Sequence, residues 1–452
     1  MTAAAKANSD PHNPEKTVKN IIARHKAGEH LGICSVCSAH PLVIEAALRF
    51  DLANGNSVLI EATSNQVNQY GGYTGMKPAD FITFVRRLAE EEHLPMNKII
   101  LGGDHLGPLT FSQYEEDKAM AESSELVRQY VSAGFTKIHI DTSMKVAGDD
   151  PDTRLSDETI SRRGAMLARV AEDAYAELLK KDPDAIHPVY IVGSEVPIPG
   201  GSQDAKDTGM QVTKVKDFEA TVAAFKNAFE SRGLEEAWKQ VIGVVVQPGV
   251  EEKDAGCTEY DREKAKELMA SINEYPNLVF EGHSTDYQTK LKLRELVEDG
   301  VGILKVGPGL TYAAREGIFA LAYAEKEMLK NEPEKQSHFM EVLDAAMTAD
   351  PKYYEKHYHG TEAEIAMKRM FSFSDRSRYY MPQPNVQKAL AVLMDNFKDG
   401  VPLGLLSQFM PMAYTKVREG KLSNDPVSLI KDRVAYTAGE YMYATHQETI
   451  QF

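Results

Sequence analysis

The segment IILGGDHLGP, from Ile99 to Pro108, contains an apolar run that stops abruptly at polar residues. Three aliphatic residues lead into two glycines, then into Asp104 and His105, before a Gly-Pro pair ends the segment. A short continuous apolar run is typical of a strand buried on both faces in a parallel sheet. The segment therefore predicts a buried strand that ends in an acid and an imidazole.

Similar apolar runs recur along the chain, and amphipathic helical patterns lie between them. The runs cover residues 31–37, 57–63, 98–104, 137–143, 188–194, 241–247, 278–284 and 301–307. Eight strand-helix units in series predict an α/β fold, the (β/α)8 TIM barrel. The alternative is an open, doubly wound sheet, which usually has fewer strands and often a glycine-rich first loop. The sequence after the first run lacks such a loop.

The chain has 452 residues, which is more than a barrel of this kind requires. We expect a flexible N-terminal tail over residues 1–17 and the barrel over residues 18–328. Residues 329–452 lack strand patterns and predict a helical C-terminal extension.

Composition and charge indicate a cytoplasmic protein that binds neither nucleic acid nor a membrane. The net charge of −16 disfavours both partners, because each attracts a basic surface. The N-terminus has no apolar signal core, and no run of about 18 apolar residues predicts a membrane helix. Cys34 and Cys37 form a CxxC pair, which we interpret as structural thiols in a reducing compartment. A redox pair or half of a zinc site is the alternative.

Polar side chains follow seven of the predicted strands, at the end of a barrel where catalytic residues gather. They are Glu61, Thr63, Asn65, Gln66, Asp104, His105, His139, Asp141, Ser143, Ser194, Glu195, Gln247, Glu281, His283, Ser284, Asp286 and Lys305. Imidazoles and carboxylates together suit a divalent metal, zinc or else nickel or manganese. The alternative is a polar ring that binds a sugar through hydrogen bonds alone. We assign Asp141, Gln247 and Ser284 to substrate binding.

Three further segments are candidates for the site. Gly307 and Gly309 lie between the eighth strand and a helix, where backbone N–H groups can hold a phosphate. Arg376 and Arg378 lie in an aromatic segment that either contacts a phosphate or sugar or packs between helices. The loop over residues 70–81 is a lid or an ordinary surface loop. The sequence lacks the P-loop pattern of many kinases.

Six motifs in order resemble the GatZ/KbaZ family, over roughly residues 15–445. They are GGDHLGP, IHIDTSM, VGSEVPIPGG, QPGVE, FEGHSTDYQ and SFSDRSRYY. Members of this family are called the non-catalytic subunit of class II D-tagatose-1,6-bisphosphate aldolase, and were formerly described as tagatose 6-phosphate kinases. The family is similar to the catalytic class II aldolases, which are zinc-dependent barrels.

The resemblance implies roles for residues at the strand ends. Asp104 would move protons, and His105 and His283 would bind the metal. Glu195 would lie near the metal as a ligand and catalytic group, and Gly307 and Gly309 would bind phosphate. Gln247 stands where class II aldolases have a further metal-binding histidine.

Two kinds of function follow from the resemblance. The first is an enzyme, a metal-dependent lyase or ketose 4-epimerase that acts on a ketose or ketose phosphate in galactitol-type or tagatose catabolism. The second is a non-catalytic subunit that stabilises a separate catalytic aldolase subunit. A tagatose 6-phosphate kinase is a weaker alternative. Because barrels of this kind often form dimers or tetramers, we also expect a homo-oligomer.

Overall fold

The structure, a computed structural model, describes residues 14–53, 57–94, 96–196 and 211–447. Eight parallel strands close into a barrel, which confirms the predicted fold class. In order around the barrel they are β1 (Ile33–Cys37), β2 (Val58–Thr63), β3 (Ile99–Leu106), β4 (Lys137–Ile140), β5 (Val189–Gly193), β6 (Val241–Val246), β9 (Val279–Gly282) and β10 (Val301–Val306). Each of the predicted apolar runs contains one of these strands, although β3 extends two residues beyond its run.

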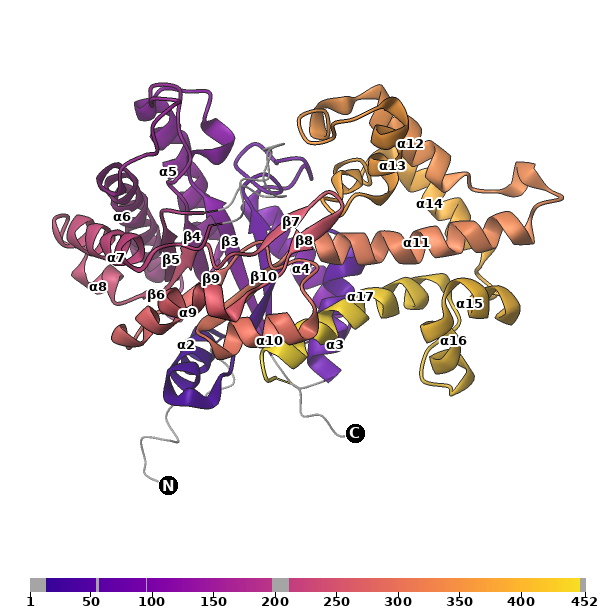
Figure 1. Ribbon diagram of the computed structural model, residues 1–452, viewed down its shortest axis with the longest axis horizontal. Helices are drawn as coiled ribbons and strands as arrows, with labels where there is room; N and C mark the ends of the chain where they lie inside the picture. The colour runs from indigo at the N-terminus through magenta and orange to yellow at the C-terminus, as the bar shows by residue number, and fades with distance from the viewer. Residues whose placement is uncertain (1–13, 54–56, 95, 197–210, 448–452) are drawn as a thin grey trace.

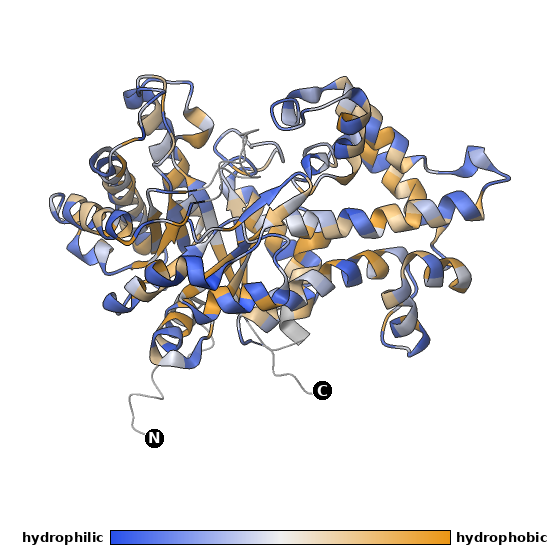
Figure 2. Cartoon of the chain, in the orientation of Figure 1, coloured by the Kyte–Doolittle hydropathy of each residue, from blue (hydrophilic) through white to orange (hydrophobic). Residues whose placement is uncertain are grey.

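Helices surround the strands as an outer layer (Figure 1). They are α3 (Pro41–Ala53), α4 (Pro78–Glu91), α5 (Glu116–Ala133), α6 (Asp157–Lys181), α7 (Val215–Glu230), α8 (Glu235–Trp238), α9 (Arg262–Ser271) and α10 (Lys290–Glu298). Helix α4 illustrates their amphipathic pattern, because Phe81, Val85 and Leu88 are buried at a spacing of four and three residues. Figure 2 shows the strands mainly apolar and the helices mixed in hydropathy.

The amino end of the barrel is filled by aliphatic side chains. Val18, Ile21 and Ile22 of α2 (Pro14–Arg24) share one buried cluster with side chains of the strands. The strand residues of this cluster are Ile33, Leu59, Ile100, Val189, Ile191, Ile242, Val245, Val279 and Ile303. This end is therefore closed to solvent, and polar side chains are left to the carboxyl end. Helix α2 begins inside the segment predicted to be a tail, and residues 1–13 lie outside the described part.

A short antiparallel hairpin follows β6 and was not predicted. Its strands are β7 (Glu251–Lys253) and β8 (Gly256–Thr258). They are three residues long and largely polar, so they lack the apolar run by which the barrel strands were identified. The hairpin places Glu252 beside the carboxyl end of the barrel.

The chain beyond the barrel strands is helical in its described part, and its last helix returns to the barrel. Helix α11 (Pro308–Met328) extends away from the barrel in Figure 1. Beyond it follow α12 (Phe339–Ala349), α13 (Glu362–Phe371), α14 (Pro384–Asn396), α15 (Leu403–Phe409) and α16 (Pro411–Arg418). Helix α17 (Pro426–Ala444) then packs along α11 and against α3 and α10. The domain boundary at residue 328 stays a prediction.

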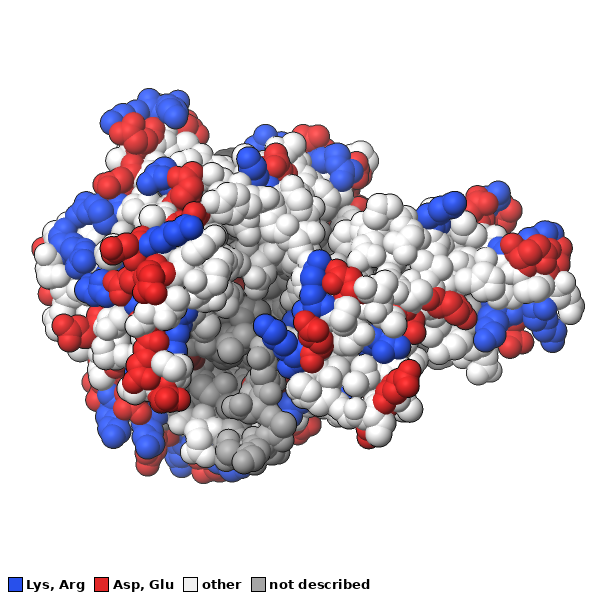
Figure 3. Space-filling model, turned by 90° about the horizontal axis from the view of Figure 1, so that it is seen from above, with Lys and Arg blue, Asp and Glu red and all other residues white. Residues whose placement is uncertain are grey.

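The surface of the described residues carries both signs of charge. On the face shown in Figure 3, basic and acidic side chains are interspersed, mainly around the periphery. No described helix is both long enough and apolar enough to cross a bilayer.

Candidate functional site

Asp104 and His105 both face the barrel interior because β3 bulges at this point. In a regular strand, adjacent side chains point to opposite faces. Strand β3 pairs with β4 at Gly103 and again at Leu106, so Asp104 and His105 together lie opposite His139. His105 adopts a left-handed backbone conformation with φ of 50°, which is uncommon outside glycine. The bulge therefore delivers two consecutive functional side chains to one site.

Two glycines of the same segment allow close approaches that a side chain would block. A Cβ atom on Gly102 would lie 2.6 Å from the carboxylate of Glu61. A Cβ on Gly107 would lie 1.7 Å from the backbone carbonyl oxygen of Asp141, at the end of β4. The glycines thus make room for a buried carboxylate and hold the ends of β3 and β4 together.

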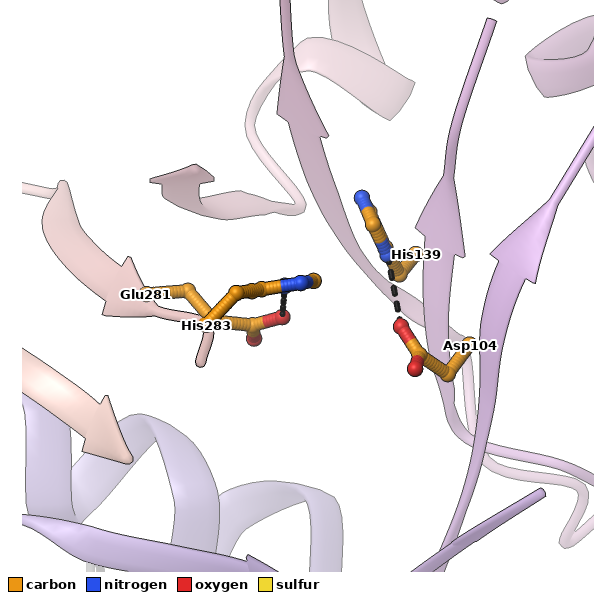
Figure 4. A group of neighbouring side chains, drawn as sticks. All are labelled: Asp104, His139, Glu281 and His283. Carbon is orange, nitrogen blue, oxygen red and sulfur yellow. Dashed lines mark hydrogen bonds and ion pairs between the residues drawn. The ribbon is translucent and has the colours of Figure 1, made fainter. Parts of the chain in front are cut away.

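Three imidazoles converge at the carboxyl end of the barrel. The rings of His105 and His139 have centroids 5.2 Å apart, and that of His283 lies 5.2 Å from the first and 5.1 Å from the second. Asp104 and Glu281 lie among them, and we call these five residues the histidine cluster. Figure 4 shows Asp104 and His139 facing Glu281 and His283.

A carboxylate orients each imidazole of the cluster. Nδ1 of His139 lies 2.7 Å from Oδ1 of Asp104, and Nδ1 of His105 lies 2.8 Å from Oδ2 of Asp141. Nε2 of His283 lies 3.0 Å from Oε1 of Glu281. Nε2 of His139 is buried and has no hydrogen-bond partner among the residues that the structure describes. Carboxylates that hold one ring nitrogen while the other faces a common centre are typical of metal-binding histidines.

A network of buried ion pairs lies against the histidine cluster. Lys137 pairs with Glu61 and, at 2.8 Å, with Glu281. Lys305 pairs with Asp104 and, at 2.7 Å, with Glu61. All five side chains are almost fully excluded from solvent. Ion pairs with this many partners hold the carboxylates of the site in fixed positions.

The network sets the protonation of the cluster. Burial alone would raise the pKa of Asp104, but His105, Lys305 and His139 outweigh it and hold this pKa well below its ordinary value. Burial would also raise the pKa of Glu281, but Lys137, His283 and Lys305 outweigh this effect and lower the pKa. Burial, reinforced by Lys305, lowers the pKa of His283 to about 3. Ionised carboxylates and a neutral imidazole are the forms that bind metals.

The buried charges around the cluster do not balance. Glu61, Asp104, Asp141 and Glu281 are four carboxylates, whereas Lys137 and Lys305 supply two positive charges. Two negative charges remain when the histidines are neutral, and uncompensated buried charge is costly. Burial lowers the pKa of His105, but Asp104 and Asp141 outweigh this effect and raise it, so the site attracts positive charge. A divalent cation would supply the missing charge, and the residues present therefore fit one.

The structure does not bring Glu195 to the histidine cluster. Its carboxylate accepts a hydrogen bond from Thr213 and lies 3.8 Å from Nη2 of Arg154. Gln247 is also engaged elsewhere, since its Oε1 accepts hydrogen bonds from the N–H groups of Gly249 and Val250 at 2.7 and 2.9 Å. Both side chains face the loop region beyond β5 and β6, and their predicted roles receive no support from these contacts.

The other predicted residues lie in or beside one cleft. Asp104, His105, His283, Ser284, Gly307 and Arg378 line it, together with Tyr73 and Tyr379. Asp141 is fully buried and contacts His105 and Ser143, so it orients an imidazole instead of facing the cleft. Arg376 packs against His357, with 2.9 Å between Nη2 and Nδ1.

A carboxylate occupies the predicted phosphate cradle. Oδ1 of Asp286 accepts hydrogen bonds from the N–H groups of Gly307 and Gly309, at 3.0 and 2.7 Å. Arg378 lines the cleft nearby, and its guanidinium donates to the carbonyls of Ser374 and Asp375 at 2.6 and 2.8 Å. The cradle can therefore bind an anion, but an acidic side chain of the protein itself holds it.

The loop over residues 70–81 and the aromatic segment that contains Arg376 and Arg378 meet at the cleft. Tyr73, from the loop after β2, and Tyr379, from the short helix Arg376–Tyr379, have ring centroids 4.8 Å apart. Both line the cleft that contains His105 and His283. Whether the loop is a lid stays a prediction.

His139 and Glu281 were predicted to lie at strand ends but were not predicted to bind the metal. The sequence spacing could have indicated this role, because Lys137 and His139 are two residues apart, as are Glu281 and His283. Side chains at this spacing lie on the same face of a strand. Glu252 was missed because its hairpin was not predicted, and the sequence holds no signal for a carboxylate folded over the cleft.

Comparisons with known proteins agree on one family. The family described as "D-tagatose-1,6-bisphosphate aldolase subunit GatZ/KbaZ-like" matches residues 18–446. A protein of Salmonella enteritidis named D-tagatose-1,6-bisphosphate aldolase subunit GatZ is 48% identical over 427 residues, which cover 94% of this chain and 98% of that protein. A Salmonella heidelberg protein of the same name is 49% identical over 428 residues, with the same coverage.

A solved structure is also similar in sequence and fold. The crystal structure of a probable tagatose 6 phosphate kinase from Sinorhizobium meliloti superposes with a TM-score of 0.82 at 43% identity. The similarity covers 91% of this chain and 100% of that one.

Proposed function

The chain belongs to the GatZ/KbaZ-like family, and from this premise we propose that it acts in tagatose-type carbohydrate catabolism as a metal-dependent enzyme on a ketose or ketose phosphate. The reaction is cleavage of the C3–C4 bond or inversion at C4. The observation that carries this proposal is the histidine cluster, in which three imidazoles and two carboxylates meet at the end of the barrel. A subunit that only stabilised another protein would not require this arrangement.

The residues of the histidine cluster and the residues packed against it would have different roles. His105, His139 and His283 would hold the metal, with Asp104 and Glu281 as further oxygen donors. A bound divalent cation, zinc or else nickel or manganese, would supply Lewis acidity towards the ketose oxygens. Asp141 fixes the ring of His105, and Lys137 and Lys305 fix the carboxylates. These contacts keep the site ordered before substrate arrives.

The remaining lining of the cleft would hold the far end of the sugar. Arg378, Tyr73 and Tyr379 belong to this lining, and Gly307 and Gly309 would offer two N–H groups if Asp286 moved away. The guanidinium favours an anionic group such as a phosphate, whereas the carboxylate of Asp286 opposes it. Ser284 is the remaining polar side chain suited to a hydroxyl group of the substrate.

A second candidate function is supported by the names of the relatives. The Salmonella proteins are named as subunits of an aldolase, so a separate catalytic subunit is a candidate partner. In this role the chain would stabilise that subunit, and its own metal site would not turn over substrate. The kinase alternative is supported only by the description of the Sinorhizobium protein. A cytoplasmic location and a homo-oligomeric state remain predictions.

An activity assay on the purified protein alone distinguishes the two proposed functions. The protein is loaded with zinc, nickel or manganese and incubated with tagatose 6-phosphate, fructose 6-phosphate or tagatose 1,6-bisphosphate. We expect interconversion of the ketose phosphates or release of trioses, detected by ¹³C NMR, and its loss after chelation. Turnover that requires an added aldolase subunit with every substrate would instead support the stabilising role.

A further inference from the structure

Glu252 is a buried acid in the cleft that the histidine cluster does not use. It lies on β7 of the hairpin after β6, and only 3% of it is exposed. It nevertheless lines the same cleft as His105 and His283. The hairpin thus carries a carboxylate over the carboxyl end of the barrel, from outside the set of barrel strands.

The carboxylate of Glu252 is incompletely satisfied. Its Oε2 is buried and has no hydrogen-bond partner among the described residues, although Ser284 donates a hydrogen bond to the carboxylate. No ion pair found in the described part of the chain includes it, whereas Asp104 is paired with His139 and Lys305. An unpartnered carboxylate oxygen on a residue that lines a cleft can accept a hydrogen bond, and then a proton, from a ligand hydroxyl.

A second acid lies beside Glu252. Burial, followed by the charge of Asp286, raises the pKa of Glu252 to about 7. Burial also raises the pKa of Asp286 to about 6, against the hydrogen bonds from Gly309 and Gly307. Further ionisable groups among the described residues also act on this pair, including Arg376, Arg378, Tyr287, Tyr441 and Cys257. A carboxyl in this setting changes its protonation near neutral pH, as a proton-transfer group requires.

We propose that Glu252 is the group that takes and returns the proton of the ketose 4-hydroxyl, an inference that rests on the proposed function. In the forward step the O4–H proton moves to the Glu252 carboxylate, and C4 becomes a carbonyl carbon as the C3–C4 bond breaks. The electron pair of that bond moves through C3 to the C2 carbonyl oxygen, which gives an enediolate. When C3 attacks either face of the aldehyde, the new alkoxide at C4 recovers the proton from Glu252, and no co-reactant is consumed.

This assignment moves proton transfer away from Asp104. The carboxylate of Asp104 contacts the imidazole of His139 and the ammonium group of Lys305, and His105, Lys305 and His139 together keep its pKa low. A strongly stabilised carboxylate is a weak base towards a hydroxyl group. Asp104 is therefore better suited to fixing His139 and balancing the metal charge.

The experiment compares full-length metal-loaded protein with the variants Glu252→Gln, Glu252→Asp and Glu259→Gln. Glu259 is an exposed glutamate just beyond the same hairpin and serves as the matched control. We expect Glu252→Gln to lower kcat for ketose phosphate interconversion by roughly 10²-fold or more, with KM changed by less than about threefold. Glu252→Asp should retain part of kcat with a shifted pH profile, and Glu259→Gln should match wild type. A kcat within about threefold of wild type in Glu252→Gln would overturn the proposal.

A second readout does not depend on turnover. Glu252 ionises near pH 4 in the unfolded chain but only at about pH 7 in the folded protein. Wild type therefore loses stability as the pH rises between these two values, and Glu252→Gln does not. Glu252→Gln should therefore raise Tm more at pH 8 than at pH 5, and Glu259→Gln should shift Tm equally at both. If wild type is inactive with every ketose, the proposed function fails, while this shift still supports a proton-accepting Glu252. An equal shift at both pH values would overturn the assignment even in an active enzyme.

Discussion

At the scale of single residues, Asp286 occupies the backbone donors of the proposed phosphate site. Its carboxylate accepts hydrogen bonds from the N–H groups of Gly307 and Gly309, which would otherwise be available to a phosphate. It also lies beside Glu252, so an incoming dianion meets two acidic side chains and one guanidinium, that of Arg378. Asp286 would therefore compete with a bound phosphate for the same donors.

Removal of this charge should strengthen phosphate binding. We expect Asp286→Asn to lower the Kd for tagatose 6-phosphate by at least about tenfold, or about 1.4 kcal/mol, because the amide keeps the shape but not the repulsion. Isothermal titration calorimetry on metal-loaded protein measures this change. Unphosphorylated tagatose is the control, and its affinity should change by less than about threefold. Weaker binding of the phosphate in Asp286→Asn would mean that Asp286 itself contributes to recognition.

At the scale of elements, the bulge of β3 and its contact with β4 build the site. Gly107 lets the end of β3 approach the carbonyl of Asp141, and Asp141 in turn orients His105. The position of an imidazole therefore depends on a glycine that never touches the cleft.

A methyl group at this contact should disturb both stability and metal binding. We expect Gly107→Ala to lower the free energy of unfolding by about 1–3 kcal/mol, because the new Cβ would overlap the carbonyl oxygen and separate the strands. Metal affinity should fall about tenfold or more through the displaced Asp141. Thermal unfolding and a metal titration measure the two effects. Gly404→Ala in α15 is the control, because nothing lies within 4 Å of its added methyl group. A Gly107→Ala protein with wild-type Tm and metal affinity would contradict this account.

The barrel strands were predictable because both of their faces are buried. Strand β6, with its run of aliphatic residues, can be identified from composition alone. The hairpin of β7 and β8 was not predictable, since its short polar strands depend on tertiary contacts. The place of α17 was also hidden, because an amphipathic pattern shows that a helix packs but not what it packs against.

The candidate site was predictable only in part, for a related reason. The sequence placed Asp104, His105 and His283 at strand ends, and the structure brings them together. It could not show that Glu195 turns to Thr213 and Arg154, because loop geometry decides that contact. The carboxylate of Asp286 in the cradle was equally hidden, since hydrogen bonds between loops leave no local pattern.

At the scale of the whole molecule, α17 joins the helical extension to the barrel. The hydroxyl group of Tyr441 on α17 donates to the carbonyl of Thr285, close to the cleft, at 3.0 Å. The carbonyl of Thr445 accepts a hydrogen bond from the N–H of Gly32, just before β1, at 2.9 Å. The C-terminal helix is thus tied to both ends of the barrel, and damage to it should reach the site.

A substitution that creates a cavity beside α17 tests whether this helix connects the helical extension to the barrel. Ile430 is fully buried and lies against Gly317 of α11. We expect Ile430→Ala to lower the free energy of unfolding by about 2–5 kcal/mol and to weaken metal retention on warming. Tyr436→Ala on the exposed face of α17 should leave both nearly unchanged. Calorimetry that shows a destabilised extension beside an unaffected, metal-retaining barrel would contradict the connection.

The histidine cluster is expected to hold a divalent metal, and the metal content of the protein tests this most directly. Wild type, His139→Ala, His283→Ala and Glu195→Gln are loaded with zinc, desalted side by side and analysed by inductively coupled plasma mass spectrometry. We expect about one ion per chain in wild type and in Glu195→Gln, and a loss of most of it in both histidine variants. A metal-free wild type, or histidine variants that keep their metal while Glu195→Gln loses it, would contradict the account.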